Sequence, residues 1–134
     1  MTRINLVTPS ELSDQHLVAE YREIFMVGSA LQKSMKSKSW EKTIENIPKE
    51  FTLNKGHVTF FYNKGKYLEK RYHKIVKEMI KRGMNPDPSR KFKKNQWPKS
   101  LFNDWKPKEE DYRIIRKRID EKIAMKPDWY RFSK

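Results

Sequence analysis

The most distinctive reactive group of this chain lies at its start, where Thr occupies position 2. A small second residue normally permits removal of the initiator Met, which would leave the α-amino group of Thr2 at the terminus. An α-amine has a pKa near 7.7–8.0, so at physiological pH it is partly neutral and nucleophilic, whereas a Lys amine is not. Such amines attack aldehyde-like carbons and form Schiff bases. Because a Met-Thr start is common, Thr2 needs a second group nearby to indicate a site.

A second set of candidate residues lies on the first expected helix. His16, Glu20 and Glu23 form one stripe, about 100° around the helix from its apolar stripe. Gln15 and Arg22 lie beside them. A carboxylate flanked by His and Arg next to the core is a plausible site. The same pattern fits a solvated face with charge pairs three residues apart, and helical geometry alone favours that interpretation.

Other chemistries find little support in the sequence. There is no Cys, which excludes disulfides, thiolate nucleophiles and Cys-based zinc sites. No P-loop, HExxH motif or Ser-His-Asp order stands out. The scattered residues His16, His57 and His73 are each more typical of surface or structural groups than of metal ligands. We therefore expect no metal and no cofactor.

The charge balance predicts a polyanionic partner. The 134 residues contain 31 Lys and Arg against 17 Asp and Glu, a net charge of +14. Nucleic acid is the leading candidate, and an anionic membrane surface is the weaker one. Basic clusters at 33–38, 64–74, 90–94 and 113–117 fit either solvated faces or phosphate contacts.

The composition indicates a folded protein without a membrane segment. An apolar fraction of 36% leans toward disorder, but four Trp, six Tyr and seven Phe with only four Gly argue against it. The longest uncharged apolar stretch, 24–31, is far shorter than a membrane span, and the N-terminus has no signal-peptide core. We expect a soluble, intracellular, cytoplasmic protein, with a monomer as the default.

Three apolar stripes predict the elements that must position these residues. The first predicts a helix from about 9 or 14 to about 36, with Thr8 as its cap and Glu11 closing a capping box. The second predicts a helix over about 65–82, ending at Lys81-Arg82-Gly83. The third, after an acidic first turn, predicts a helix over about 108–125. The stripe residues are Leu17, Tyr21, Ile24, Gly28, Leu31 and Met35; Leu68, Tyr72, Ile75 and Met79; and Tyr112, Ile115, Ile119 and Ile123.

The expected architecture is all-α. Residues 1–134 would form a small single domain of three main helices with long ordered loops. The Phe- and Tyr-rich segment 57–62 is the one place where periodicity alone would also allow a short strand.

Seven short segments carry a resemblance to a known family. They are MTRINL at 1–6, SELSDQHL at 10–17, AEYRE at 19–23, GHVTFFY at 56–62, KRG at 81–83, RIDEKIA at 118–124 and PDWY at 127–130. In order and spacing they resemble the pyrimidine-dimer DNA glycosylases of T-even bacteriophages. The segments 27–54 and 84–110 do not share the resemblance.

The resemblance implies a small three-helix DNA-repair enzyme that acts at ultraviolet photoproducts. In that family the N-terminal Thr amine attacks the sugar C1′ of the damaged nucleotide, the base leaves, an imine forms, and β-elimination breaks the strand. The family kinks the duplex and flips out a nucleotide opposite the dimer, which fits the general need to take a base out of the stack before chemistry on its glycosidic carbon. The implied partner is double-stranded DNA containing pyrimidine dimers or abasic sites.

The resemblance also implies the site residues. Thr2 and Glu23 match the catalytic amine and carboxylate. The DNA-contacting positions match Arg3, Arg22, Arg118 and Lys122, with Gln15 and His16 beside them.

Two rival hypotheses remain open. Position 26 is Met, where the phage enzymes carry a basic residue near the lesion, so the chain could be a non-catalytic or lesion-shifted basic DNA-binding protein on the same scaffold. A basic helical domain for a membrane surface or a protein partner is the weaker rival. Neither rival needs Thr2 and Glu23 together.

Overall fold

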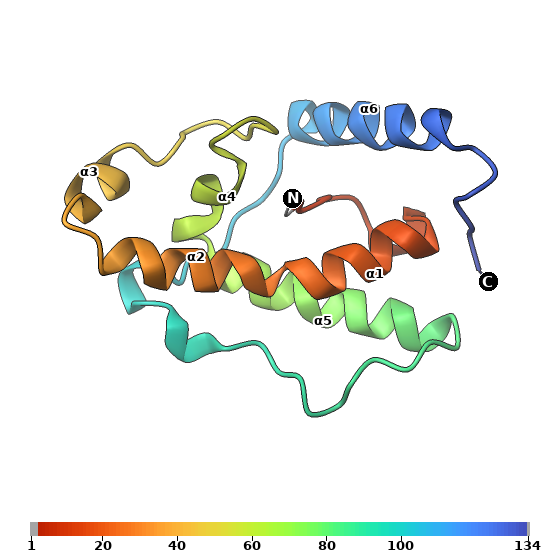
Figure 1. The fold of residues 1–134 in the computed structure, drawn as a ribbon, viewed down its shortest axis with the longest axis horizontal. Coiled ribbons are helices and arrows are strands. Elements are labelled where there is room, and N and C mark those ends of the chain that lie inside the picture. Colours follow the sequence, from red (N-terminus) through yellow and green to blue (C-terminus); the bar gives the residue numbers. More distant parts are fainter. Residues whose placement is uncertain (1–2, 134) are drawn as a thin grey trace.

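The computed structural model describes residues 3–133, and within that range every regular element is a helix (Figure 1). This confirms the prediction of a small all-α domain. Short 3-10 turns supplement the α-helices at Pro9–Glu11, Phe61–Asn63, Lys94–Gln96 and Lys99–Leu101. The α-helices are α1 (Asp14–Glu23), α2 (Phe25–Met35), α3 (Trp40–Glu45), α4 (His57–Phe60), α5 (Gly65–Lys81) and α6 (Glu109–Met125).

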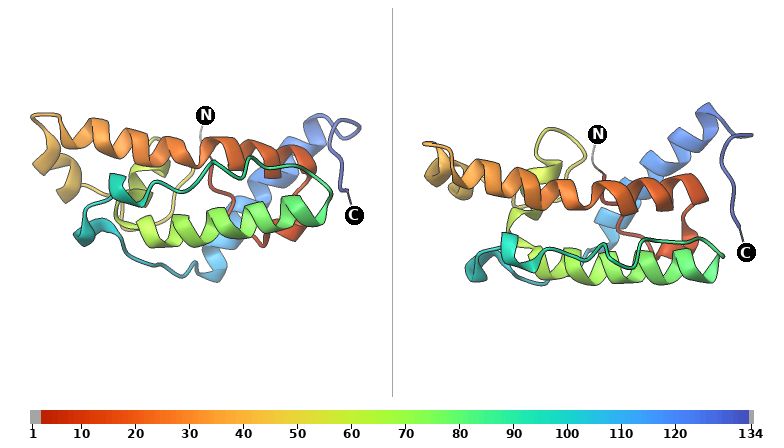
Figure 2. Two further views of the ribbon diagram at one scale, coloured as in Figure 1. Left: turned by 90° about the horizontal axis from the view of Figure 1, so that it is seen from below. Right: turned by 60° about the horizontal axis from the view of Figure 1, so that its bottom comes forward.

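The first predicted helix is divided, which corrects the simple three-helix picture. α1 and α2 run end to end with an irregularity at Ile24, whose side chain is buried (Figure 2). The chain then adds the short helices α3 and α4 before α5. The stripe from Leu17 to Leu31 nevertheless faces the core as predicted, so the periodicity identified the buried face but not the break.

The predicted capping box at the start of that helix is wrong. Thr8 makes no side-chain cap, and Glu11 instead forms an ion pair with Arg116 of α6 at 3.0 Å. Ser13 is the true cap of α1, since its Oγ accepts a hydrogen bond from the His16 amide. Leu12 separates the 3-10 turn Pro9–Glu11 from α1. Its backbone is extended, which ends the turn, and its side chain is buried.

The other two predicted helices are confirmed as α5 and α6. α5 ends in a Schellman motif: Gly83, with φ of +82°, donates to the Ile80 carbonyl and Met84 donates to the Met79 carbonyl. A positive φ is strained for a residue with a Cβ, which explains glycine at this position. At its start α6 is fixed by the Lys108 amide, which donates to the Asp111 carboxylate.

The segment 57–62 is helical, so the strand alternative is wrong. His57, Phe60 and Phe61, at helical spacing, are all buried. Their rings contact one another and Phe51 in edge-to-face geometry, and this packing overrides the strand propensity of the segment.

The core lies between α1–α2, α5 and the N-terminal segment. α5 packs along α1, and α6 lies on the other side of residues 3–8, inclined to both (Figures 1 and 2). Ile4 and Val7 of that segment are almost completely buried. The N-terminal segment is thus a central element of the fold rather than a surface arm.

Arg82 provides a first test of these connections. Its side chain is 3% exposed, and the guanidinium donates to Glu78 at 2.8 Å, to Asp14 at 2.9 Å and to the Leu12 carbonyl at 2.7 Å. Removing one member of such a network leaves its partners unpaired, so Arg82→Met should lower the free energy of unfolding by about 3 kcal/mol. Urea denaturation measures this, with exposed Lys81→Met as a control expected within about 0.5 kcal/mol of wild type. If the two variants were equally stable, the stabilising role assigned to the Arg82 network would be wrong.

Candidate active site

A pocket of about 340 Å³ lies between the N-terminal segment, α1 and α6. It gathers five of the residues predicted from the sequence, namely Arg3, His16, Glu23, Arg118 and Lys122. Asn5, Ala19, Glu20, Ile119 and Tyr130 also line it. Three segments far apart in the chain therefore contribute to one site that contains a carboxylate and several cations.

Helical spacing explains why these side chains point the same way. On α1, His16 and Glu23 are seven residues apart, two turns along one face. On α6, Arg118 and Lys122 are four residues apart, one turn along the face beside the buried Ile119. The packing of α6 over the N-terminal segment brings the two faces together.

Gln15 and Arg22 lie in an adjoining pocket rather than in this one. That pocket, of about 440 Å³, is lined by both residues with Trp129 and Arg131, and it shares Ala19 with the first. The Gln15 side chain donates to the Trp129 carbonyl at 2.6 Å and accepts from the Arg131 amide at 2.9 Å. Gln15 thus holds the C-terminal segment beside the site. Thr2 lies outside the described residues.

The cations of the first pocket influence one another. Burial lowers the pKa of Arg3, and the nearby Arg118 lowers it further, while Glu23 acts in the opposite direction. Burial also lowers the pKa of His16, helped by Lys122 and opposed by Glu20. His16 is therefore a neutral ring at neutral pH. It stacks on Tyr130 at 4.8 Å between ring centroids and contacts the Ser13 hydroxyl at 2.7 Å.

Glu20 is a structural carboxylate, and the interpretation of a solvated face is wrong for it. Its side chain is completely buried and forms an ion pair with Arg71 of α5, with nitrogen–oxygen distances of 2.6 and 3.0 Å. It also accepts from the backbone and side-chain amides of Asn5, at 3.2 and 2.9 Å. Arg71 in turn donates to the Val7 carbonyl. This network fixes the N-terminal segment against α1 and α5.

The sequence interpretation missed Asn5 and Arg71. Arg71 belongs to the basic cluster of 64–74, yet it lies three residues after Leu68 and four before Ile75, within the apolar stripe of α5. A basic residue within an apolar stripe indicates a buried charge, and this was the signal in the sequence for the role of Arg71. Asn5 carries no such signal, because its burial depends on a carboxylate 15 residues later.

His57 anchors the same segment from the other side. Its Nε2 accepts a hydrogen bond from the Ile4 amide at 2.9 Å, and its Nδ1 lies 2.8 Å from the Thr52 carbonyl. Since a carbonyl can only accept, Nδ1 carries the proton and Nε2 is the acceptor. Burial lowers the pKa of His57 to about 4, so the ring stays neutral and keeps its acceptor.

The segment bends sharply between these anchors. Leu6 has a φ of +57°, and the Val7 amide donates to the Asn5 carbonyl across it. A buried Leu in this conformation is strained and persists only where the surroundings fix it. The bend directs Arg3 and Asn5 into the pocket and turns the chain toward α1.

Two other functional features are absent from residues 3–133. No group of three or more His, Asp or Glu side chains there could hold a metal ion. None of the helices in that range has the length and apolar character needed to cross a membrane.

Together, the fold and the pocket define a class of protein: a small, basic, all-α protein with a carboxylate in a cationic pocket, suited to a polyanionic substrate. Comparison with protein families makes this specific. The family model of pyrimidine dimer DNA glycosylases matches residues 1–92 of the 134. The chain belongs to this family of DNA-repair glycosylases, and the resemblance predicted from its sequence is confirmed.

The family match covers only part of the residues that line the active-site pocket. The N-terminal segment, α1 and α5 all lie within residues 1–92, and so do Arg3, Glu23 and the network around Glu20. Arg118, Lys122 and Tyr130 lie beyond it, on α6 and the segment that follows.

The His57 anchor predicts a dependence of stability on pH. The folded protein protonates His57 only near pH 4, whereas the unfolded chain does so near pH 6.5. Between these values the unfolded state binds more protons, so stability should fall as the pH is lowered from about 6.5 to about 4. The loss due to His57 between pH 7 and pH 5 should be about 2 kcal/mol, measured by urea denaturation.

His57→Gln separates this effect from other titrations, because Gln offers an acceptor to the Ile4 amide but does not titrate. We expect the variant to lose less stability than wild type on acidification. An equal loss in both proteins would show that His57 is not the group responsible.

Proposed function

We propose that this chain acts as a glycosylase on ultraviolet-induced pyrimidine dimers in duplex DNA and then cleaves the strand at the resulting abasic site, using the α-amine of Thr2 and the carboxylate of Glu23. The observation that carries the proposal is the position of Glu23, in a pocket that is also lined by the cations Arg3, Arg118 and Lys122 and is entered by the N-terminal segment. Arg3, the residue that follows Thr2, lines that pocket.

The chemistry follows from an amine and a carboxylate placed together. The neutral amine attacks the sugar C1′, a carbon–nitrogen bond forms as the glycosidic bond breaks, and the leaving base takes up a proton while the amine loses one. Opening of the sugar ring gives an imine. Loss of a proton from C2′ then expels the 3′ phosphate by β-elimination. Glu23 acts on the sugar ring and the imine, as a proton acceptor and donor.

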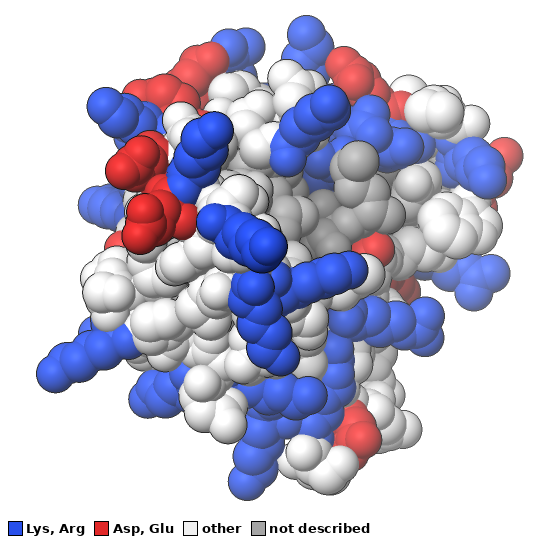
Figure 3. Space-filling model, turned by 60° about the vertical axis from the view of Figure 1, so that its left-hand side comes forward, with Lys and Arg blue, Asp and Glu red and all other residues white. Residues whose placement is uncertain are grey.

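The cations of the pocket suit the phosphates that flank a reacting sugar. Arg3, Arg118 and Lys122 extend into it from two sides, and contacts of this kind position a duplex without reading its sequence. Arg22 and Gln15, in the adjoining pocket, extend the DNA-binding surface toward Trp129. Basic side chains predominate on the face of the molecule shown in Figure 3, which favours a duplex partner.

The pocket also has room for a flipped group. Its volume of about 340 Å³ lies within the range of sites that hold small organic ligands. The stacked pair of His16 and Tyr130 supplies a flat apolar wall on which a base could stack. The proposed enzyme is one domain over residues 1–134, acts as a monomer and needs no cofactor.

One observation favours the alternative of a lesion-shifted DNA-binding protein. Met26, where the phage enzymes carry a basic residue, is 54% exposed on the first turn of α2. Its side chain offers no charge to a phosphate. Nicking of irradiated and untreated plasmid separates the two functions, because equal nicking of both would exclude a dimer glycosylase while leaving abasic cleavage possible.

The imine mechanism predicts a covalent intermediate. Incubation with an abasic-site duplex and borohydride should reduce the imine to a stable amine and yield a protein–DNA adduct, visible as a band shift on a denaturing gel. Mass spectrometry should first establish that Thr2 is the terminal residue, because a retained Met would displace the amine. Absence of the adduct with a Thr2 terminus would exclude the mechanism.

Glu23→Gln tests the carboxylate. It should lower strand cleavage at abasic sites by at least about 100-fold while leaving duplex affinity intact, since a proton-transfer group contributes about 10²–10⁴ in rate. Glu121→Gln, an exposed change of equal charge on α6, is the matched control and should cleave normally. Cleavage by Glu23→Gln at the control's rate would rule out the role assigned to Glu23.

A further inference from the structure

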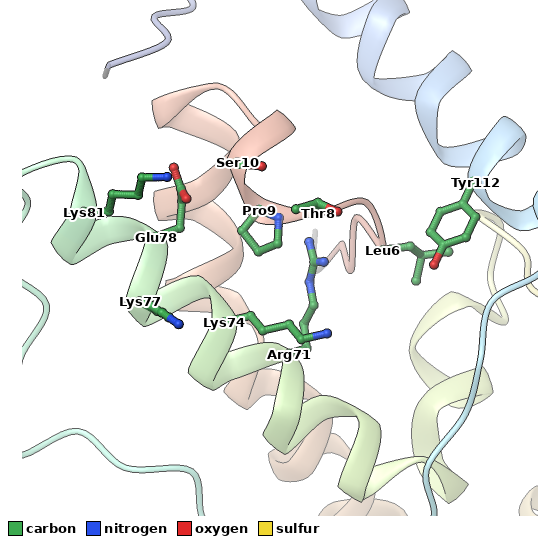
Figure 4. A pocket seen from close by; sticks show the side chains of 10 residues that line it. All are labelled: Leu6, Thr8, Pro9, Ser10, Arg71, Lys74, Lys77, Glu78, Lys81 and Tyr112. Carbon is green, nitrogen blue, oxygen red and sulfur yellow. The ribbon is translucent and has the colours of Figure 1, made fainter.

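We propose a second DNA-backbone-binding surface, the α5 groove, on the side of the molecule away from the candidate active site. Its core is a cavity of about 410 Å³ lined on one wall by Lys74, Lys77 and Lys81 of α5. The opposite wall includes Tyr112 of α6, and the segment 8–10 lies between the two (Figure 4). The proposed occupant is a second segment of duplex DNA.

The lysines form one continuous row. Lys66, Lys70, Lys74, Lys77 and Lys81 follow at spacings of four, four, three and four residues, which keeps them on one face of α5. At 1.5 Å per residue the row extends roughly 22 Å. A row of this length matches several successive phosphates of a duplex strand, whereas a small anion would need only one or two of these amines.

The groove continues past Lys74 into a neighbouring cavity. That cavity, of about 330 Å³, is lined by Lys70 and Lys106 and shares Leu6, Arg71, Lys74 and Tyr112 with the first. The basic lining therefore follows α5 from Lys70 to its end at Lys81. This elongated shape suits a polymer backbone.

The acidic groups of the groove are already neutralised. Glu78 forms an ion pair with Arg82 at 2.8 Å, and Asp104 forms one with Lys70. By contrast, across residues 3–133 no ion pair or hydrogen bond involves the exposed amines of Lys74, Lys77 and Lys81. Their charge is available to an outside partner.

The chemistry of the lining favours phosphate over sequence recognition. Lysine amines are point charges on long stems and bind phosphate without fixed geometry. The exposed Thr8 and Ser10 add hydroxyl donors at the floor of the groove, a further type of group that commonly contacts DNA phosphates. We therefore expect sequence-independent binding to undamaged duplex.

The N-terminal segment separates this groove from the candidate active site. Asn5 lines the active-site pocket, whereas Leu6 lines the α5 groove. The buried ion pair spans the same division, with Glu20 on the active-site side and Arg71 on the groove side. Two duplex segments can thus contact one molecule, which would let the protein pass directly from one segment to the next. This inference rests on DNA binding at the candidate active site.

The test is the rate at which the protein leaves a labelled undamaged duplex as unlabelled duplex is added, measured by stopped-flow fluorescence. Direct transfer makes the wild-type rate rise with competitor concentration. Lys74→Gln/Lys77→Gln/Lys81→Gln should make the rate independent of competitor. It should also reduce the salt slope of binding to long duplex by up to about 2.7, at about 0.9 for each lost phosphate contact.

A matched control removes the same charge elsewhere. Lys91→Gln/Lys93→Gln/Lys99→Gln alters three exposed lysines of the segment between α5 and α6 and should keep the dependence on competitor. Circular dichroism of both triple variants should show the same helical content as wild type.

Cleavage of a short abasic duplex separates this inference from the proposed function. The α5 variant should cleave it at the wild-type rate if the two surfaces are distinct. The inference is overturned if the wild-type dissociation rate does not depend on competitor concentration, or if the rate of the α5 variant still does. It is also overturned if the control variant loses this dependence to the same extent as the α5 variant. Slower abasic cleavage by the α5 variant would show that the groove belongs to the active site, which also overturns it. Failure of wild type to cleave at all would instead refute the proposed function.

Discussion

The buried ion pair between Glu20 and Arg71 is the interaction on which the rest of the structure depends. Both side chains are almost completely excluded from solvent. Charges in such a place cost several kcal/mol each unless they are paired and every remaining donor and acceptor is satisfied. Here Asn5 and the Val7 carbonyl complete the set, and no buried side-chain nitrogen or oxygen of residues 3–133 lacks a partner. This network holds α1, α5 and the N-terminal segment in register with one another.

The candidate site is a consequence of this constraint. An N-terminal amine can serve as a nucleophile only where the chain end is held in place, because a loose terminus would lose orientation at each encounter. The ion pair, the His57 acceptor and the bend at Leu6 hold the segment that leads from Thr2. α1 and α6 then add Glu23 and the cations around it. Membership of the pyrimidine dimer DNA glycosylase family fits this construction.

The large positive charge is divided among several tasks. Arg71 and Arg82 connect elements of the fold, and Arg90 lies over the rings of Tyr21 and Phe25 at 4.3 and 4.1 Å. These cations are structural. Arg3, Arg118 and Lys122 line the pocket around Glu23, whereas Lys74, Lys77 and Lys81 line the groove along α5. Net charge alone predicted a polyanion but could not separate these tasks.

Much of the fold could be predicted because helical periodicity is a local property. The stripes of α5 and α6, and the Lys81-Arg82-Gly83 ending, depend on residues within a few positions of each other, and both helices were placed to within a residue or so. The break at Ile24, the helical state of 57–62 and the cap at Ser13 were not predicted. The helical state of 57–62 depends on tertiary packing, such as Phe51 against Phe60, and Ile24 at the break is buried in the core.

The sequence by itself determined the helical class, the family and the residue types available for chemistry, because composition, spacing and motifs carry that information directly. Only the tertiary structure decided which of two carboxylates on one helix face is structural. Glu20 and Glu23 are a single turn apart, and the sequence pattern treats them alike. The difference arises because Arg71, 51 residues away from Glu20, reaches that carboxylate through the core, while Glu23 lines a pocket closed by α6. Long-range pairing of this kind leaves no local signal in the chain.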